Sequence, residues 1–278
     1  MKIVILRGGA MAGQAPVAMP AGKQPGLRLP VRTSPGVTAL GSGDGRWVLI
    51  NVSAAVAQQL AHDGALGAHA GLHNAAVQAV LLTDAHIEHV GGLIGLRGNA
   101  AIELYATPSV FEDLSTHLPV LPALQHYCDV QWHVVPVAGD HQVACFEVEG
   151  LPKLEFTAMA TQSTPPAHLK RGANPAVGDS IALAVHDRST GQRVFCAPGG
   201  ACIGAVEFDW MRQADCLLLD PELLISPELQ SPGRDCFELL AQLPARHKVL
   251  LAERQLACSR SAAAPGFAVA FDRMAIEL

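Results

Sequence analysis

The segment AVLLTDAHIEHVGG, residues 79–92, joins the pattern of a buried strand to a dense group of metal-binding side chains. An aliphatic run ends at Asp84, and His86, Glu88 and His89 follow before two glycines and another apolar stretch. Carboxylates and imidazoles are costly to place this close together unless a cation lies between them. The segment therefore predicts a metal site at the end of a buried strand, with Asp84, His86, Glu88 and His89 as ligands.

The composition limits the class of protein. The chain has 278 residues, of which 50% are hydrophobic and 16% charged, as expected for a compact globular protein. We expect one domain over residues 1–278, because no segment has the length and polarity of a linker. The net charge of −6 provides no basic surface for nucleic acid or anionic lipid, and no apolar run is long enough to cross a bilayer.

The seven cysteines and the N-terminal segment bear on the cellular compartment. The cysteines form no C-x-x-C pair, and the chain does not begin with an export signal, so we expect reduced thiols and a cytoplasmic location. A homodimer is compatible with the sequence.

Short apolar runs alternate with helical patterns and predict an α/β fold. The expected strands are residues 1–7, 37–40, 46–51, 75–82, 102–106, 154–160, 180–186, 193–197, 216–219, 248–252 and 267–271. The expected helices are residues 54–60, 92–96, 108–116, 208–213 and 236–242.

A strand that ends in H-x-H-x-D-H, followed by glycines and a helix, is the signature of the metallo-β-lactamase fold. This chain resembles that signature, with Asp84 at its first ligand position and Glu88 at its third. The resemblance implies a four-layer αββα sandwich, in which two sheets pack face to face and helices cover both outer surfaces.

Several further motifs resemble the coenzyme PQQ synthesis protein B family, in order along nearly the whole chain. That family has T-D-A-Q-I-D-H where this chain has TDAHIEH. The other matching segments are RWVLINVS (46–53), GDSIAL (178–183), FCAPG (195–199), DCLLLD (215–220) and AFDRMAIEL (270–278).

The chain also departs from that family. Residues 8–24 lack the cysteine cluster that holds the family's structural zinc, so no structural zinc is expected. Ala252 stands where the family has a histidine, and Ala197-Pro198-Gly199 replaces the bridging aspartate of ordinary metallo-β-lactamases. Glu253 is a candidate replacement ligand, although a solvated glutamate at a strand end is the alternative.

The resemblance implies a metal-dependent oxygenase or oxidoreductase in pyrroloquinoline quinone synthesis. The family is thought to hydroxylate the tyrosine of a Glu-Tyr precursor, so a small-molecule or peptide substrate and a divalent metal, iron or zinc, are expected. Two alternatives remain open. One is a non-catalytic carrier with a degenerate metal site, and the other is a metallohydrolase in which a metal-bound hydroxide attacks the substrate.

Asp84 and Asp220 are the candidate catalytic carboxylates. Asp220 ends a buried strand, where functional groups and plain turn caps are both common. In the alternative interpretation of the main cluster, Asp84 caps a helix, Glu88 is solvated and the histidines bond to the backbone. A second group, His126, Cys128, His133 and His141, has no common metal-ligand spacing.

Overall fold

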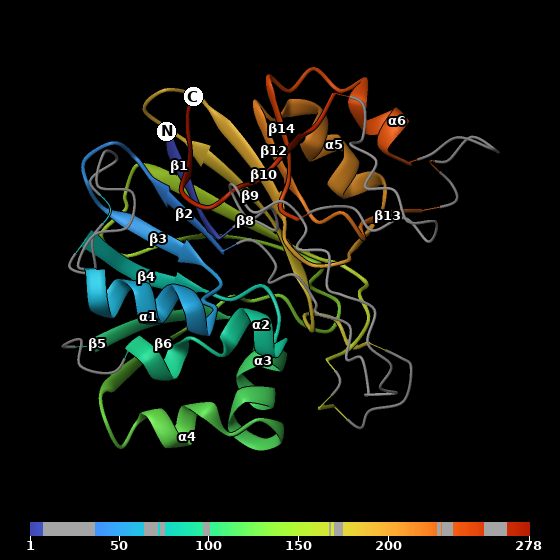
Figure 1. The fold of residues 1–278 in the computed structure, drawn as a ribbon. Helices are drawn as coiled ribbons and strands as arrows, with labels where there is room; N and C mark the ends of the chain where they lie inside the picture. Colours follow the sequence, from blue (N-terminus) through green and yellow to red (C-terminus); the bar gives the residue numbers. More distant parts are fainter. Residues whose placement is uncertain are drawn as a thin grey trace, which may run out of the picture.

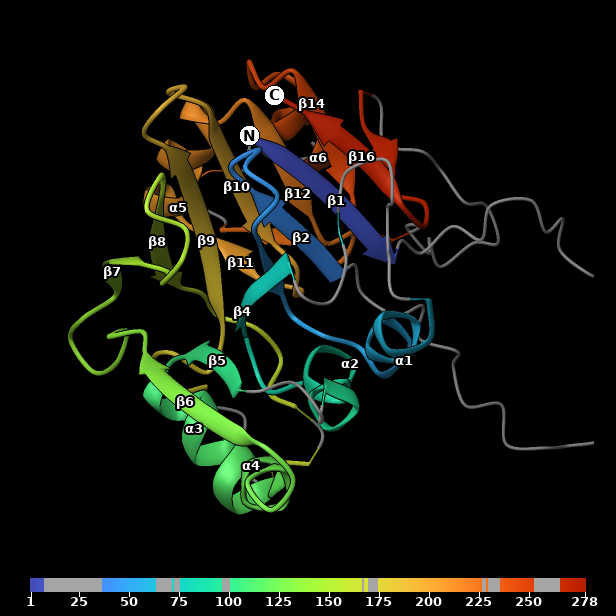
Figure 2. The same cartoon turned by 90° about the vertical axis from the view of Figure 1, so that its left-hand side faces the viewer.

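The computed structural model describes residues 1–7, 37–63, 72, 76–96, 101–166, 168–169, 175–226, 229, 236–252 and 266–278. Within them, two large sheets pack face to face, and helices lie on the outer side of each sheet (Figures 1 and 2). The chain ends meet in the first sheet, where Lys2 lies opposite Glu277.

The first sheet has the strand order β16-β1-β2-β3-β4-β5-β6. β3 to β6 run parallel to one another, while β16, β1, β2 and β3 form antiparallel pairs. The bounds are β1 (Lys2–Arg7), β2 (Val37–Gly41), β3 (Trp47–Ile50), β4 (Val77–Leu81), β5 (Ala101–Ala106), β6 (Asp129–Val134) and β16 (Met274–Glu277).

The second sheet has the order β15-β14-β12-β10-β9-β8-β7. Its bounds are β7 (Val143–Glu147), β8 (Leu154–Ala160), β9 (Ile181–Asp187), β10 (Arg193–Ala197), β12 (Cys216–Leu219), β14 (His247–Leu250) and β15 (Ala268–Val269). Two short strands, β11 (Cys202–Ile203) and β13 (Leu224–Ile225), pair separately.

Three apolar clusters define the layers. One packs the first sheet against its helices, the second fills the space between the sheets, and the third packs the second sheet against its helices. The helices are α1 (Ala54–Asp63), α2 (Ile87–Val90), α3 (Pro108–Glu112), α4 (Val120–Leu124), α5 (Ala205–Gln213) and α6 (Cys236–Ala241). Because each sheet is buried on both faces, the predicted four-layer αββα sandwich is confirmed.

Most predicted elements are present within a few residues of their expected bounds. The predicted strands 154–160, 193–197 and 216–219 coincide with β8, β10 and β12. The predicted helix 92–96 is a 3-10 turn over Leu93–Leu96, and the helix predicted over 108–116 passes into a π-helical turn at Asp113–His117.

The sequence prediction missed the strands β6, β7, β11, β13 and β16 and the short helices α2 and α4. β6 and β7 are sheet edges with exposed or half-buried residues, so they lack the apolar run that marks the inner strands. None of the helices formed by the described residues is long and apolar enough to span a membrane.

Candidate metal centre

The loop after β4 carries the predicted ligands and is tied to the second sheet. The Ile181 amide, at the start of β9, donates to the Thr83 carbonyl over 2.9 Å, and Asp84 forms an isolated antiparallel bridge with Ser180. The loop then turns into α2, for which His86 is the residue before the first turn. His86 precedes this short helix and His89 lies within it, and both imidazoles approach the Asp84 carboxylate.

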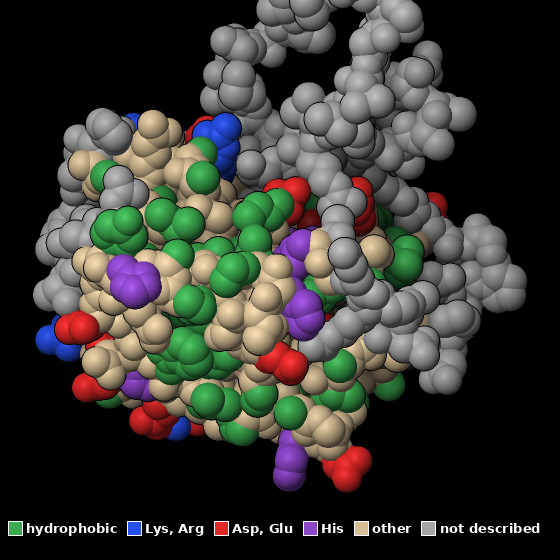
Figure 3. Space-filling model, turned by 90° about the horizontal axis from the view of Figure 1, so that it is seen from below, with side chains coloured by type: hydrophobic (Ala, Val, Ile, Leu, Met, Phe, Trp, Pro, Cys, Tyr) green, Lys and Arg blue, Asp and Glu red, His purple; other side chains and the backbone are tan. Residues whose placement is uncertain are grey.

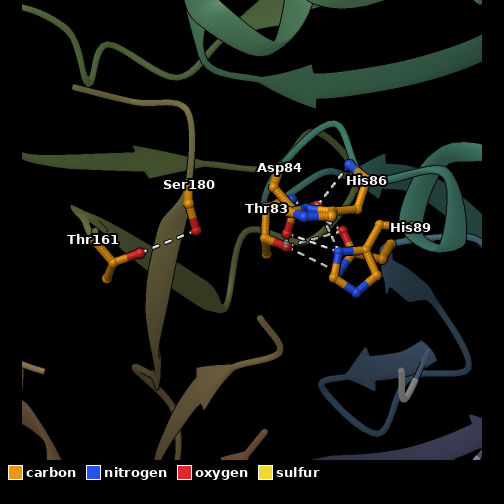
Figure 4. A network of polar contacts seen from close by, with 7 residues as sticks. Thr83, Asp84, His86, His89, Thr161 and Ser180 are labelled. Atoms are coloured by element: carbon orange, nitrogen blue, oxygen red, sulfur yellow. Dashed lines mark hydrogen bonds and ion pairs between the residues drawn. The ribbon is translucent and has the colours of Figure 1, made fainter. Parts of the chain in front are cut away.

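Asp84, His86 and His89 form one cluster, whose ligand atoms lie within 4.8 Å of one another (Figure 4). His89 Nδ1 lies 2.7 Å from both Asp84 carboxylate oxygens, and His86 Nδ1 lies 3.0 Å from Oδ1. The His86 amide also donates to Oδ1 over 2.9 Å. Two imidazoles and one carboxylate therefore converge from a single loop.

The cluster opens on the side of His86. The His86 side chain is 21% exposed, whereas those of His89 and Asp84 are 3% and 2% exposed. Histidine side chains gather beside acidic ones on the face of the molecule seen in Figure 3. Within the described residues, His86 is therefore the member of the cluster that is most exposed to solvent.

The donor set fits a divalent transition metal. His89 Nε2 is buried and has no hydrogen-bond partner among the described residues, although buried polar atoms are rarely left unpaired. Two histidines and one carboxylate form a three-ligand face used by non-haem iron sites, and they also suit zinc. The cluster thus supports divalent-metal binding from the chemistry of its own residues.

The histidines keep Asp84 ionised. Burial alone raises the pKa of Asp84, but the charges and hydrogen bonds of His89 and His86 outweigh it and hold that pKa far below its ordinary value. An ionised carboxylate is the form that binds a cation, so a lowered pKa favours metal binding by Asp84.

A chain of hydrogen bonds from Asn51 through Thr83 orients the Asp84 carboxylate. Thr83 donates its hydroxyl to Asp84 Oδ2 over 2.9 Å and receives a 2.9 Å hydrogen bond from Asn51 Nδ2. The Thr83 amide in turn donates to Asn51 Oδ1 over 3.0 Å. Asn51 has a left-handed backbone with φ of 62°, which asparagine tolerates better than most residues. The sequence analysis did not identify Asn51 as part of the site.

Gly92 allows a close approach of the backbone, and Gly199 lies next to Asp84. A Cβ on Gly92 would lie 2.3 Å from the Ser53 carbonyl oxygen, so the chain after α2 passes the first sheet only without a side chain. A Cβ on Gly199, after β10, would lie 3.5 Å from Asp84 Oδ2. The Ala197-Pro198-Gly199 segment, which lacks the bridging aspartate, therefore lies directly beside the cluster.

Asp220 approaches the cluster from the end of β12. Its amide donates to the Ala197 carbonyl, and its Oδ1 accepts from the Glu222 amide over 2.7 Å. Burial raises its pKa to about 6, with the nearby charges of Glu222, His89 and Asp84 as smaller influences. In the metal-free chain this carboxyl group therefore exchanges its proton at a higher pH than an ordinary aspartate does.

Glu88 does not join the cluster of Asp84, His86 and His89. It lies in the first turn of α2, where a negative charge stabilises the helix dipole, and its role as a metal ligand stays a prediction. Ala252 is buried and provides no ligand atom. Glu253 and residues 8–24 lie outside the described residues.

His168 lies close enough to His86 for their charges to interact, and the sequence analysis did not single it out. Burial and the charges of His86 and His117 lower its pKa, whereas the charge of Asp113 raises it. Its Nε2 is buried without a hydrogen-bond partner among the described residues. It follows a T-P-P segment with no ligand spacing, so no sequence signal marks it.

A four-layer sandwich with carboxylate and histidine donors after β4 defines a member of the metallo-β-lactamase superfamily. The family model described as Beta-lactamase superfamily domain matches residues 46–251. Within this superfamily, the chain belongs to the coenzyme PQQ synthesis protein B family. It is 33% identical to that protein from Klebsiella pneumoniae over 257 residues, which cover 84% of this chain and 82% of the relative.

Other relatives and solved structures agree. The coenzyme PQQ synthesis protein B of Cupriavidus taiwanensis is 35% identical over 81% of this chain and 78% of its own length. The zinc-bound PqqB crystal structure from Methylobacterium extorquens matches with a TM-score of 0.70 and 20% identity, with both chains fully covered. Human tRNase Z, short form, matches at a TM-score of 0.58 and 15% identity over 100% of this chain and 99% of its own. These structural matches show the shared fold.

Proposed function

We propose that this protein is a metal-dependent oxygenase that acts on a small tyrosine-containing or peptide-derived substrate in pyrroloquinoline quinone synthesis. The observation that carries the proposal is the convergence of Asp84, His86 and His89, with the orphaned Nε2 of His89 among them. Membership of the coenzyme PQQ synthesis protein B family supports the assignment to this pathway.

In this proposal Asp84, His86 and His89 hold one divalent metal, and the substrate approaches from the side of His86, the most exposed of the three side chains. We propose iron(II) as the working metal, because two histidines and one carboxylate leave positions free for dioxygen and substrate. When bound, the iron supplies the activation of dioxygen. Zinc fits the same donors and acts as a competitor.

Asp220 serves as the proton-carrying group of the proposed site. Its carboxylate is largely ionised at neutral pH and can accept a proton from a phenol or ammonium group of the substrate, and a cation bound at the neighbouring cluster would favour the ionised form further. Asn51 and Thr83 fix the direction of the Asp84 carboxylate, so that its oxygens stay aimed at the two imidazoles.

The test is an anaerobic iron(II) titration of chelator-treated protein, followed by oxygen uptake with a tyrosine-containing peptide and ascorbate as the electron donor. We expect a tight iron site that His86→Ala and His89→Ala each abolish, so that each variant binds one iron ion fewer than the wild type, and oxygen uptake that depends on that ion. His141→Ala serves as the matched control, because His141 is exposed and lies outside the cluster.

Undiminished tight binding in both His86→Ala and His89→Ala would refute the metal assignment. Tight iron binding without oxygen uptake would favour the non-catalytic carrier. Hydrolysis of phosphodiesters or lactones by the metal-loaded protein, lost in the same two variants, would favour a metallohydrolase.

A further inference from the structure

We propose a second metal site, formed by Glu103, His133 and Glu149, that takes a zinc-like divalent ion at the edge of the sandwich. Ligand atoms of these three side chains lie within 4.8 Å of one another. Glu103 is on β5, His133 on the edge strand β6, and Glu149 follows β7 of the second sheet. The site is separate from the cluster on the loop after β4 and does not depend on the proposed oxygenase activity.

The strand register brings the first two ligands together. Tyr105 lies opposite His133 in the parallel β5–β6 pair, so Glu103, two residues before Tyr105, projects from the same sheet face. His133 Nε2 lies 2.5 Å from Glu103 Oε2. An imidazole nitrogen and a carboxylate oxygen thus already face each other in a short hydrogen bond, and a bound cation would replace that hydrogen bond by moving the two atoms apart.

Aromatic stacking fixes the imidazole of His133. Its ring stacks on the Tyr105 ring with 4.3 Å between centroids and an interplanar angle of 7°. Tyr105 is itself buried and stacks on Phe146, which stacks on Phe156 in the core between the sheets. The orientation of His133 is therefore supported by the core.

Glu149 is held by its backbone. Its amide donates to the Tyr105 hydroxyl over 3.0 Å, and the next carbonyl, of Gly150, accepts from Arg46 Nη1 over 3.1 Å. Gly150 has a φ of 81°, a conformation that suits glycine and turns the chain at this point. The third ligand therefore comes from a backbone position fixed on both sides.

The charges of the cluster favour a cation. Among the residues that the structure describes, no lysine or arginine forms an ion pair with Glu103 or Glu149, and only His133 pairs with Glu103. Two carboxylates brought this close repel each other unless a positive charge lies between them. The imidazole of His133 can supply at most one positive charge against the two carboxylates, whereas a divalent ion offsets both.

The donor types select the ion. One imidazole and two carboxylates suit zinc and neighbouring transition ions, and an imidazole ligand disfavours calcium and magnesium. Zinc binds such a trio in tetrahedral geometry with water as the fourth ligand. The bound ion would link β5 and β6 of the first sheet to the segment after β7 of the second, and so would join the edges of the two sheets.

The experiment measures zinc bound by the full-length chain in equilibrium dialysis at micromolar zinc. The Asp84→Asn/His89→Gln double variant serves as background, so that the first cluster no longer contributes. We expect the background protein to bind about one zinc ion that His133→Gln and Glu149→Gln each weaken at least about tenfold. His126→Gln, at an exposed histidine outside the cluster, should leave binding unchanged.

A zinc-dependent rise in melting temperature gives a second readout, expected in the background and in the His126→Gln control and absent from His133→Gln. The proposal is overturned if the background binds no zinc, or if binding survives both His133→Gln and Glu149→Gln. It is also overturned if His126→Gln lowers binding as much as His133→Gln does. Circular dichroism confirms that each variant is folded before it is compared.

Discussion

Replacing Asp220 by asparagine should stabilise the metal-free protein at neutral pH. In the folded chain burial raises the pKa of Asp220 from 3.8 to about 6, so ionising this carboxyl group opposes folding. Each pKa unit corresponds to about 1.4 kcal/mol. The whole shift therefore lowers the free energy of unfolding by about 3 kcal/mol once the pH lies above both the unfolded and the folded pKa. An asparagine side chain at this position would keep the same shape, and its amide oxygen could still accept from the Glu222 amide.

The sign of the pH dependence follows from the raised pKa. Because the folded state holds the Asp220 proton more tightly than the unfolded state, the contribution to stability is fully present below pH 3.8. It is lost as the pH rises through about 6. The advantage of the asparagine variant should therefore be near zero below pH 4, grow between pH 4 and 6, and level off above pH 7.

Urea unfolding in the presence of a chelator, repeated from pH 4 to pH 8, measures this difference in the free energy of unfolding. Asp209→Asn is the matched control, because the Asp209 side chain on α5 is 68% exposed. Its effect should stay within about 0.5 kcal/mol at every pH. A flat difference between wild type and Asp220→Asn across this range would refute the assignment of a raised pKa.

Three further outcomes are expected. Asn51→Ala should weaken metal affinity about 10- to 100-fold in a direct titration, because Thr83, which bonds to Asp84, loses its hydrogen bonds to Asn51. The control Gln58→Ala, on α1, should leave the affinity unchanged. Gly92→Ala should destabilise the fold by about 1–3 kcal/mol in urea unfolding, since its Cβ would meet the Ser53 carbonyl, and unchanged stability would contradict that close approach. Phe156→Ala should lower the free energy of unfolding by about 3–5 kcal/mol in urea unfolding, because this ring is fully buried between the sheets. A loss below about 1 kcal/mol would show that the core around Phe156 is not tightly packed.

The inner strands of the sheets can be predicted from the sequence because they are buried on both faces. β8, β10 and β12 show uninterrupted or nearly uninterrupted apolar runs, which predict strands without knowledge of their partners. The edge strands β6 and β7 bury little, so their residues alternate without a clear apolar pattern, and only their pairing with β5 and β8 reveals them.

The sequence by itself determined the family, the layered α/β architecture, and the local donors Asp84, His86 and His89. All three donors lie within one turn and one loop, so their spacing along the chain nearly fixes their spacing in the fold.

Only the tertiary structure decided what lies around these donors. Asn51, Gly199 and Asp220 come from three other strand ends, and Glu103, His133 and Glu149 meet from both sheets. Such contacts depend on the strand order and on the packing of one sheet against the other. No local pattern in the chain encodes them.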